Sequence, residues 1–336
     1  MNLSDIAKLA GVSKATVSSV LNGKAAKYRI SQKTQDKVLK VVQENHYQPN
    51  HSAASLRSGK SFSIGLIVPD FENRSYLRIA KRLEALARKK GYQLIIASSD
   101  DDPATELESA QKLVSRGIDA LMVSTCVTDA GHYETIQHQG VPVIALDRAL
   151  PDCFSNVISD DFDGGLQLTR ALPLAQLSSI TFIGAMPELS ISKERERGFT
   201  AAVSGIGGLK SYLYYGSHFN PDSGKALLRR AFQEQGALPP AIVTTSYALL
   251  EGVISELQNE FGPGLNRLEP IHLATFGDSR LLDFLPIPVV SLPQQYEKIA
   301  ETAWHITEQA IENSCLPQRC IIKRNLNNRP ETQAGS

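Results

Sequence analysis

From residue 63 onward, short apolar runs alternate with stretches of helical periodicity, and this alternation limits the possible folds more than any other feature of the chain. The first three runs begin about 28 residues apart, roughly the length of one strand–helix–strand unit. Such alternation predicts open parallel sheets with helices on both faces. The strand-like runs are residues 64–68, 94–97, 120–123, 141–146, 157–159, 180–183, 241–245 and 273–276.

The alternating region is about 275 residues long, which exceeds the usual size of a single hydrophobic core. We therefore predict two doubly wound lobes of parallel sheet rather than one. The composition, with 42% hydrophobic and 21% charged residues, is ordinary for a globular protein. No apolar run is long enough to cross a bilayer, so we expect no membrane partner.

The net charge of zero hides an uneven distribution of charge along the chain. Residues 1–60 contain ten Lys and Arg against three acidic residues, a net charge of +7. Because the whole chain has 35 residues of each sign, the remainder has 25 basic and 32 acidic residues, a net charge of −7. A basic N-terminal unit indicates a polyanionic partner for that unit, and a solvated basic face is the alternative.

The first 45 residues have the pattern of a helix-turn-helix. Asn2 can cap a first helix that Gly11 ends, and Ser13 can cap a second helix that runs to about Leu21. Two short helices joined by a tight turn of this kind place the start of the second helix in the major groove of DNA. Ser31 can cap a third helix that closes a small core, with apolar positions at Val38, Leu39, Val41 and Val42.

The second helix begins with residues suited to reading DNA. Lys14 can donate to guanine, and Ala15 can contact a thymine methyl group. Short polar side chains near them suit phosphate oxygens, and we include the following loop among the candidates. A short amphipathic bundle without nucleic acid is the alternative. The remaining DNA-binding candidates are Ser13, Thr16, Ser18, Ser19, Asn22, Tyr28, Arg29 and Ser31.

A short segment follows the N-terminal unit. Pro49 disfavours helix at Gln48 and can itself begin a new helix, which Gly59 would end. A helix of about two turns is marginal in water by itself. The segment is therefore either a helix that forms on a partner or a plain linker.

Residues 6–18 (IAKLAGVSKATVS) closely resemble the headpiece signature of the LacI/GalR family of transcription regulators. The resemblance implies a helix-turn-helix head at residues 1–48, a hinge helix at 49–60, and an effector-binding and dimerisation core at 61–336. In this family the hinge helix forms on operator DNA and inserts an apolar side chain into the minor groove, which kinks the duplex. The positions matched here are Asn50, Ala53 and Leu56.

The resemblance also implies a fold class: a small all-α helix-turn-helix head and an α/β core of two doubly wound parallel-sheet lobes, similar to periplasmic binding proteins. We place the first lobe at about residues 61–161 and 290–320. The second lobe then covers about residues 162–289 and 321–330.

Polar residues follow many of the predicted strands, where ligands of such sheets bind. Asp147 and Arg148 come directly after the fourth run, and carboxylates and arginines suit a polyhydroxylated, charged ligand. An ordinary ion pair, a solvated charge or a helix cap is the alternative for each residue. The family resemblance adds Arg195, the sugar-contacting Asp278 and the polar contact Ser246 on the other wall, with two weaker matches, Ser75 and Gln294.

The chain is most similar to the fructose-repressor branch of the family, partly because the loop at residues 22–31 is lengthened. That branch responds to fructose 1-phosphate, with fructose 1,6-bisphosphate as the alternative, which implies a sugar-phosphate effector. Another sugar or a purine is the further alternative. Two departures stand out. Arg74 replaces a small polar residue beside the expected site, and Lys14-Ala15 differs from the usual base-reading pair.

We find no Gly-x-Ser-x-Gly elbow, dinucleotide fingerprint or zinc-ligand spacing, so we expect no enzyme, cofactor or metal site. A secreted sugar-binding protein is the rival of another class. The N-terminus lacks the pattern of a signal peptide, which favours a cytoplasmic regulator.

The C-terminus shows no leucine heptad, so we expect a homodimer on double-stranded operator DNA, with a tetramer as the alternative.

Overall fold

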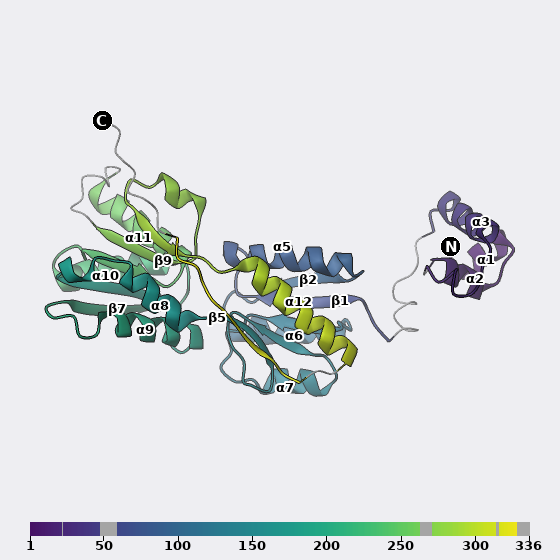
Figure 1. The fold of residues 1–336 in the computed structure, drawn as a ribbon, viewed down its shortest axis with the longest axis horizontal. Coiled ribbons are helices and arrows are strands. Elements are labelled where there is room, and N and C mark those ends of the chain that lie inside the picture. The colour runs from purple at the N-terminus through teal and green to yellow at the C-terminus, as the bar shows by residue number, and fades with distance from the viewer. Residues whose placement is uncertain (22, 48–58, 263–270, 314–315, 328–336) are drawn as a thin grey trace. The chain divides into compact units, whose positions relative to one another are not determined.

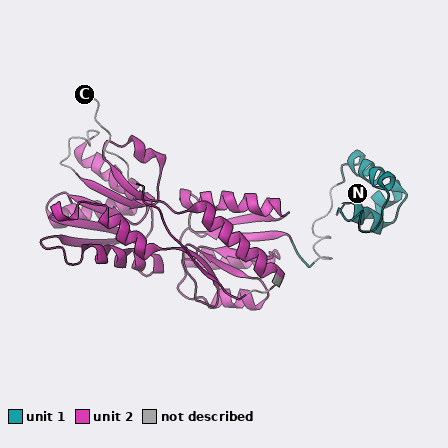
Figure 2. Ribbon diagram, viewed as in Figure 1, with its two compact units in different colours: residues 1–61 teal, residues 62–336 magenta. Residues whose placement is uncertain are grey.

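The computed structural model describes residues 1–21, 23–47, 59–262, 271–313 and 316–327. The chain forms two compact units, Met1–Ser61 and Phe62–Ser336 (Figure 2). The predicted DNA contacts Asn22, Asn50, Ala53 and Leu56 lie outside the described residues, as does most of the predicted hinge helix.

The N-terminal unit is a three-helix bundle of α1 (Leu3–Ala10), α2 (Lys14–Leu21) and α3 (Gln32–Glu44). Asn2 and Asp5 form a capping box at the start of α1, and Gly11 ends that helix with a φ of 62°. The prediction of Leu39 as a core residue was wrong, because its side chain is 48% exposed. The buried core consists of Ile6, Ala7, Ala10, Val17, Val20, Ala25 and Val38.

The first lobe of the second unit is a parallel sheet with strand order β11-β5-β4-β3-β1-β2. Helices α5 and α12 cover one face and α6 and α7 the other (Figure 1). Alternate residues of β1 therefore lie in different cores: Leu66 packs toward α5, and Ile67 packs toward α6. The elements are β1 (Ser63–Val68), α5 (Arg74–Lys89), β2 (Gln93–Ser98), α6 (Pro103–Ser115), β3 (Ala120–Val123), α7 (Gly131–His138), β4 (Val143–Leu146), β5 (Ser155–Ser159), α12 (Tyr296–Asn313) and β11 (Arg319–Ile322).

The second lobe is a parallel sheet with strand order β10-β9-β8-β6-β7. Two separate apolar clusters cover its two faces. Its elements are α8 (Asp161–Arg170), η1 (Leu174–Gln176), β6 (Ser179–Ala185), α9 (Ser190–Val203), β7 (Lys210–Gly216), α10 (Pro221–Gln235), β8 (Ala241–Thr244), α11 (Tyr247–Phe261), β9 (His272–Phe276), η3 (Arg280–Phe284) and β10 (Val289–Leu292).

The two sheets confirm the doubly wound, two-lobed fold predicted from the alternation. The chain crosses between the lobes after β5, after β10 and after β11. Relative to the expected boundaries, the second and third crossings lie two or three residues later, after Leu292 and Ile322, because β10 and β11 each complete their pairing first. None of the helices in the described ranges is both long and apolar enough to span a bilayer.

Helices α8 and α9 meet at two glycines, and this contact positions residues of the site described below. A Cβ on Gly198 would lie 2.2 Å from the carbonyl oxygen of Phe162, and one on Gly165 would lie 2.5 Å from that of Arg195. Only hydrogen side chains allow the two backbones to approach so closely. The two glycines thus set the distance between Asp161, at the start of α8, and Arg195, on α9.

Candidate functional site: a charged cavity between the lobes

A cavity of about 290 Å³ lies between the two lobes of the second unit. Its walls come from segments that follow the carboxyl ends of strands in both sheets, where open α/β sheets bind their ligands. Six of the seven predicted effector residues line it: Ser75, Asp147, Arg148, Arg195, Ser246 and Gln294.

The seventh predicted residue, Asp278, is not among the residues that line the cavity. Its carboxylate accepts a hydrogen bond of 2.8 Å from the hydroxyl of Ser291 on β10. Arg74, the departure noted in the sequence, also lies outside the lining, and its guanidinium is 3.5 Å from the hydroxyl of Ser279 in the other lobe.

Asp147 and Arg148 bind different partners rather than each other. Asp147 has a φ of 63° and accepts hydrogen bonds from Tyr76, at 2.8 Å, and from Gln294. Burial and then the charge of Asp147 raise the pKa of Tyr76 above its usual range. The Tyr76 hydroxyl therefore stays protonated and is a neutral donor.

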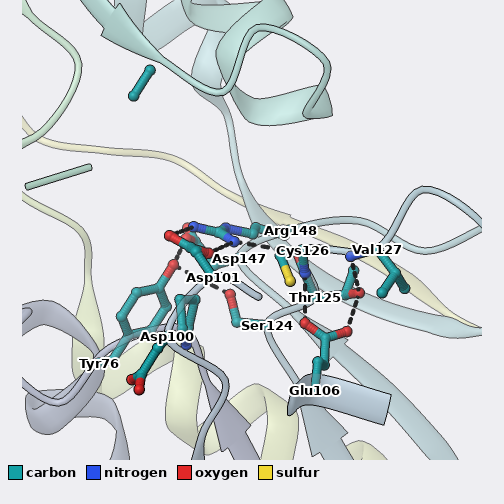
Figure 3. A network of polar contacts seen from close by, with 12 residues as sticks. Tyr76, Asp100, Asp101, Glu106, Ser124, Thr125, Cys126, Val127, Asp147 and Arg148 are labelled. Carbon is teal, nitrogen blue, oxygen red and sulfur yellow. Dashed lines mark hydrogen bonds and ion pairs between the residues drawn. The ribbon is translucent and has the colours of Figure 1, made fainter. Parts of the chain in front are cut away.

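Arg148 is bound by a carboxylate from another loop. Its side chain is 3% exposed and makes two contacts, of 2.5 and 3.3 Å, with the oxygens of Asp101 (Figure 3). Its guanidinium also lies 5.7 Å from the ring centre of Phe219, in the second lobe. Burial lowers the pKa of Arg148, but the Asp101 and Asp147 carboxylates offset this effect, so the pKa is raised and the charge is kept.

A second buried carboxylate supports the loop behind Arg148 (Figure 3). Glu106 accepts hydrogen bonds from the hydroxyls of Thr125 and Tyr133, both at 2.5 Å, and from the amide of Cys126 at 2.7 Å. The carbonyl oxygen of Thr125 in turn accepts a bond of 3.4 Å from Arg148. Glu106 thereby positions the backbone on which Arg148 rests.

Two further arginines share one carboxylate on the opposite side of the cavity. Arg195 Nε and Arg324 Nη2 each lie 2.9 Å from Asp161 Oδ1, and both guanidinium groups lie over Phe276, at 4.5 and 5.3 Å from its ring centre. Arg195 also donates to the carbonyl oxygen of Thr245 at 2.7 Å. Two cations against one anion leave this group with a net positive charge.

Sequence reasoning missed Arg324, Asp101, Tyr76 and Glu106 as residues of the site. Arg324 follows the end of β11 by two residues, so its signal in the sequence is a position just after a strand. Asp101 likewise follows the end of β2, whereas Tyr76 and Glu106 lie within helices and carry no such signal.

The cavity wall also contains polar atoms that lack a protein partner within the described residues. Arg148 Nε, Arg324 Nε and Thr245 Oγ1 are buried there without a hydrogen bond. Leaving a buried polar group unpaired costs about 1–3 kcal/mol, so such atoms indicate a polar ligand. Hydroxyl-binding carboxylates together with arginines fit a sugar that carries an acidic group.

The predicted DNA-reading surface is also assembled in the N-terminal unit. Lys14 and Ala15 are exposed at the start of α2, and Tyr28 is 59% exposed in the loop before α3. Ser13 and Ser31 are exposed, and each caps a helix by accepting the amide of the third residue after it. Arg29 is exposed as well, whereas Thr16, Ser18 and Ser19 are partly buried.

A helix-turn-helix head joined to a two-lobed ligand-binding core defines a class of ligand-responsive transcription regulators. Residues 2–50 match the family model of bacterial regulatory proteins of the lacI family. Residues 61–259 match the model of periplasmic binding proteins and the sugar-binding domain of the LacI family. The chain therefore belongs to the LacI family, which confirms the resemblance seen in the sequence.

Two curated relatives lie within one branch of this family. The chain is 52% identical to the fructose operon regulatory protein of Vibrio cholerae, over 90% of this chain and 92% of that protein. It is 41% identical to the catabolite repressor/activator of Escherichia coli, over 97% of both chains. These relatives are transcription regulators, so the chain is a DNA-binding regulator and not an enzyme.

A solved structure resembles the core. It is the Cra transcriptional dual regulator of Pseudomonas putida in complex with fructose 1-phosphate, which is 44% identical with a TM-score of 0.76. The match covers 80% of this chain and 99% of that chain.

Proposed function

We propose that this regulator binds operator DNA of genes for fructose and central carbon metabolism and is released by a phosphorylated sugar, fructose 1-phosphate. Three buried arginines on the walls of one cavity carry the proposal, because a neutral sugar does not require them. The fructose 1-phosphate bound to the 44% identical relative supports the same effector. The protein acts as a repressor, with dual repression and activation as the alternative.

Within the cavity, Asp147 would accept hydrogen bonds from sugar hydroxyls, and Arg195 and Arg324 would hold the phosphate. Ser75 and Gln294 from the first lobe and Ser246 from the second offer further polar contacts. An effector that contacts both walls binds most tightly to one arrangement of the lobes, so it shifts the population toward that arrangement. By linkage, operator DNA weakens effector binding by the same factor.

In the head, Lys14 and Ala15 would reach base edges, while the neighbouring polar and basic residues would contact phosphates. We propose a homodimer, since two heads on a pseudo-palindromic site add their contacts. The protein would act in the cytoplasm, together with its DNA.

Titration of the operator complex with fructose 1-phosphate should release the protein, because the phosphate gains partners in the cavity that fructose lacks. Fluorescence anisotropy of a labelled operator, selected in vitro with the full chain, measures this release. Neutral fructose at equal concentration is the control. Release by fructose and not by fructose 1-phosphate would refute the proposed effector.

Replacing Lys14 by Ala should weaken operator binding by about tenfold to a hundredfold, the size of a lost base contact. Anisotropy with the selected operator and with variants at each position measures affinity and specificity. Lys210→Ala, which removes an exposed lysine at the start of β7, is the matched control and should bind as the wild type does. Equal affinities for Lys14→Ala and the control would contradict the base-reading role.

A further inference from the structure

The two walls of the cavity carry opposite charge. On the wall formed by the first lobe, one guanidinium, that of Arg148, stands among five carboxylates. On the other wall, Arg195 and Arg324 share the single carboxylate of Asp161. The five carboxylates of the first wall belong to Asp70, Glu72, Asp100, Asp101 and Asp147.

Asp101 determines whether Arg148 is available to an anion. The pair is nearly desolvated, since the two side chains are 3% and 9% exposed, and it uses both carboxylate oxygens. A buried bidentate ion pair of this kind is stronger than an ion pair on the surface. The guanidinium is thus already neutralised by a carboxylate of the protein itself.

The loop that carries Asp101 has an uncommon backbone. Asp100 and Asp101 have φ values of 53° and 54°, a region that residues other than glycine seldom occupy. The turn is held by the amide of Asp102, which donates to the carbonyl oxygen of Ser99 at 2.9 Å, and by the Ser98 hydroxyl, 2.5 Å from Asp100. Such strain persists only where surrounding contacts maintain it, and here it directs a carboxylate into the cavity.

We propose that Asp101 is a specificity-determining residue: by neutralising Arg148 it keeps the first-lobe wall negative, so the cavity accepts an effector with one phosphate and rejects one with a second phosphate at that wall. This inference rests on the proposed function, because it concerns the same site and the same class of effector.

The single phosphate then binds at the wall of Arg195 and Arg324. That wall has an excess of positive charge, and within the described residues Arg324 Nε and Thr245 Oγ1 are buried there without protein partners. Arg148 Nε on the first-lobe wall is also unpartnered, but its guanidinium group already binds Asp101. The hydroxyls of the sugar face the carboxylates of the first lobe. A second phosphate at that end would meet Asp101 and Asp147 at close range, and charges of one sign a few ångströms apart repel strongly where water is largely excluded.

The test compares fructose 1-phosphate with fructose 1,6-bisphosphate by isothermal titration calorimetry on the full chain. In Asp101→Asn, Arg148 loses its anionic partner, so the preference for the monophosphate should fall by about tenfold or more. The double variant Asp101→Asn/Arg148→Gln should restore the preference, because the freed guanidinium is then absent. Asp152→Asn is the matched control, since it removes the carboxylate partner of the exposed Arg319, outside the cavity.

A purely structural role for Asp101 predicts that both affinities fall together with the ratio unchanged, and that result would overturn the proposal.

A second pair of variants tests the location of the phosphate even if Asp101→Asn does not fold. Arg148→Gln should keep the preference for fructose 1-phosphate over fructose, and Arg324→Gln should lose it by about tenfold or more. The opposite result, in which Arg148→Gln loses the preference and Arg324→Gln keeps it, would also overturn the proposal. If the wild type binds neither phosphate, the proposed function itself fails.

Discussion

Fructose 1-phosphate should no longer release the Arg195→Ala variant from operator DNA, although the variant still binds that DNA. The substitution removes one of the two guanidinium groups on the second-lobe wall, and loss of a buried charged partner costs about 2–5 kcal/mol. Effector affinity should therefore fall at least about thirtyfold. Calorimetry gives the affinity, and anisotropy with labelled operator gives the release.

Arg197→Ala is the matched control for this variant. Arg197 lies on the same helix, its side chain is 64% exposed, and it pairs with Glu194 three residues earlier. We expect its effector response to equal that of the wild type. Retention of a normal response by Arg195→Ala, at the same effector concentration, would remove Arg195 from the binding site.

Replacing Gly198 by Ala should destabilise the core and weaken effector binding together. The added methyl group would lie 2.2 Å from the carbonyl oxygen of Phe162 and 2.8 Å from the amide nitrogen of Leu166, so α8 and α9 must separate. Overpacking of this kind costs about 1–3 kcal/mol, and backbone on both sides places this site at the upper end. Thermal unfolding with and without fructose 1-phosphate measures both effects.

The weakened binding follows from the positions of Asp161 and Arg195, which these two helices carry. Gly207→Ala is the control, because a Cβ at that position meets no atom within 4 Å. The control should unfold at the wild-type temperature. A melting temperature of Gly198→Ala equal to that of Gly207→Ala would show that the close helix contact is not required.

Much of the fold could be predicted because its signals are local. The capping box at Asn2, the helix end at Gly11 and the serine caps at Ser13 and Ser31 involve residues within five positions of each other. The alternation of apolar runs and amphipathic stretches likewise reports which elements form, since each period reflects its own backbone geometry. Such local signals place Asp147 and Arg148 after the end of a strand, while the family resemblance supplied Ser75, Arg195, Ser246 and Gln294. All six residues line one cavity.

The partners within that cavity could not be predicted in this way. Arg148 pairs with Asp101 across 47 residues, and Arg324 pairs with Asp161 across 163. Asp278 matched a family position, yet its carboxylate lies beside Ser291 and outside the lining. No local pattern distinguishes these outcomes, because each depends on which loops the two sheets bring together.

The sequence alone was sufficient to predict the two modules, eight of the strands and the polar residues that follow several of them, whereas β7, β10 and β11 were not among the predicted runs. The predicted features follow from short-range periodicity, capping and the composition of each segment. The folded core is needed to know which charges neutralise one another, because a carboxylate and a guanidinium act on each other through distance and burial rather than through sequence separation. The division of the cavity into an acidic and a basic wall is therefore a property of the folded core.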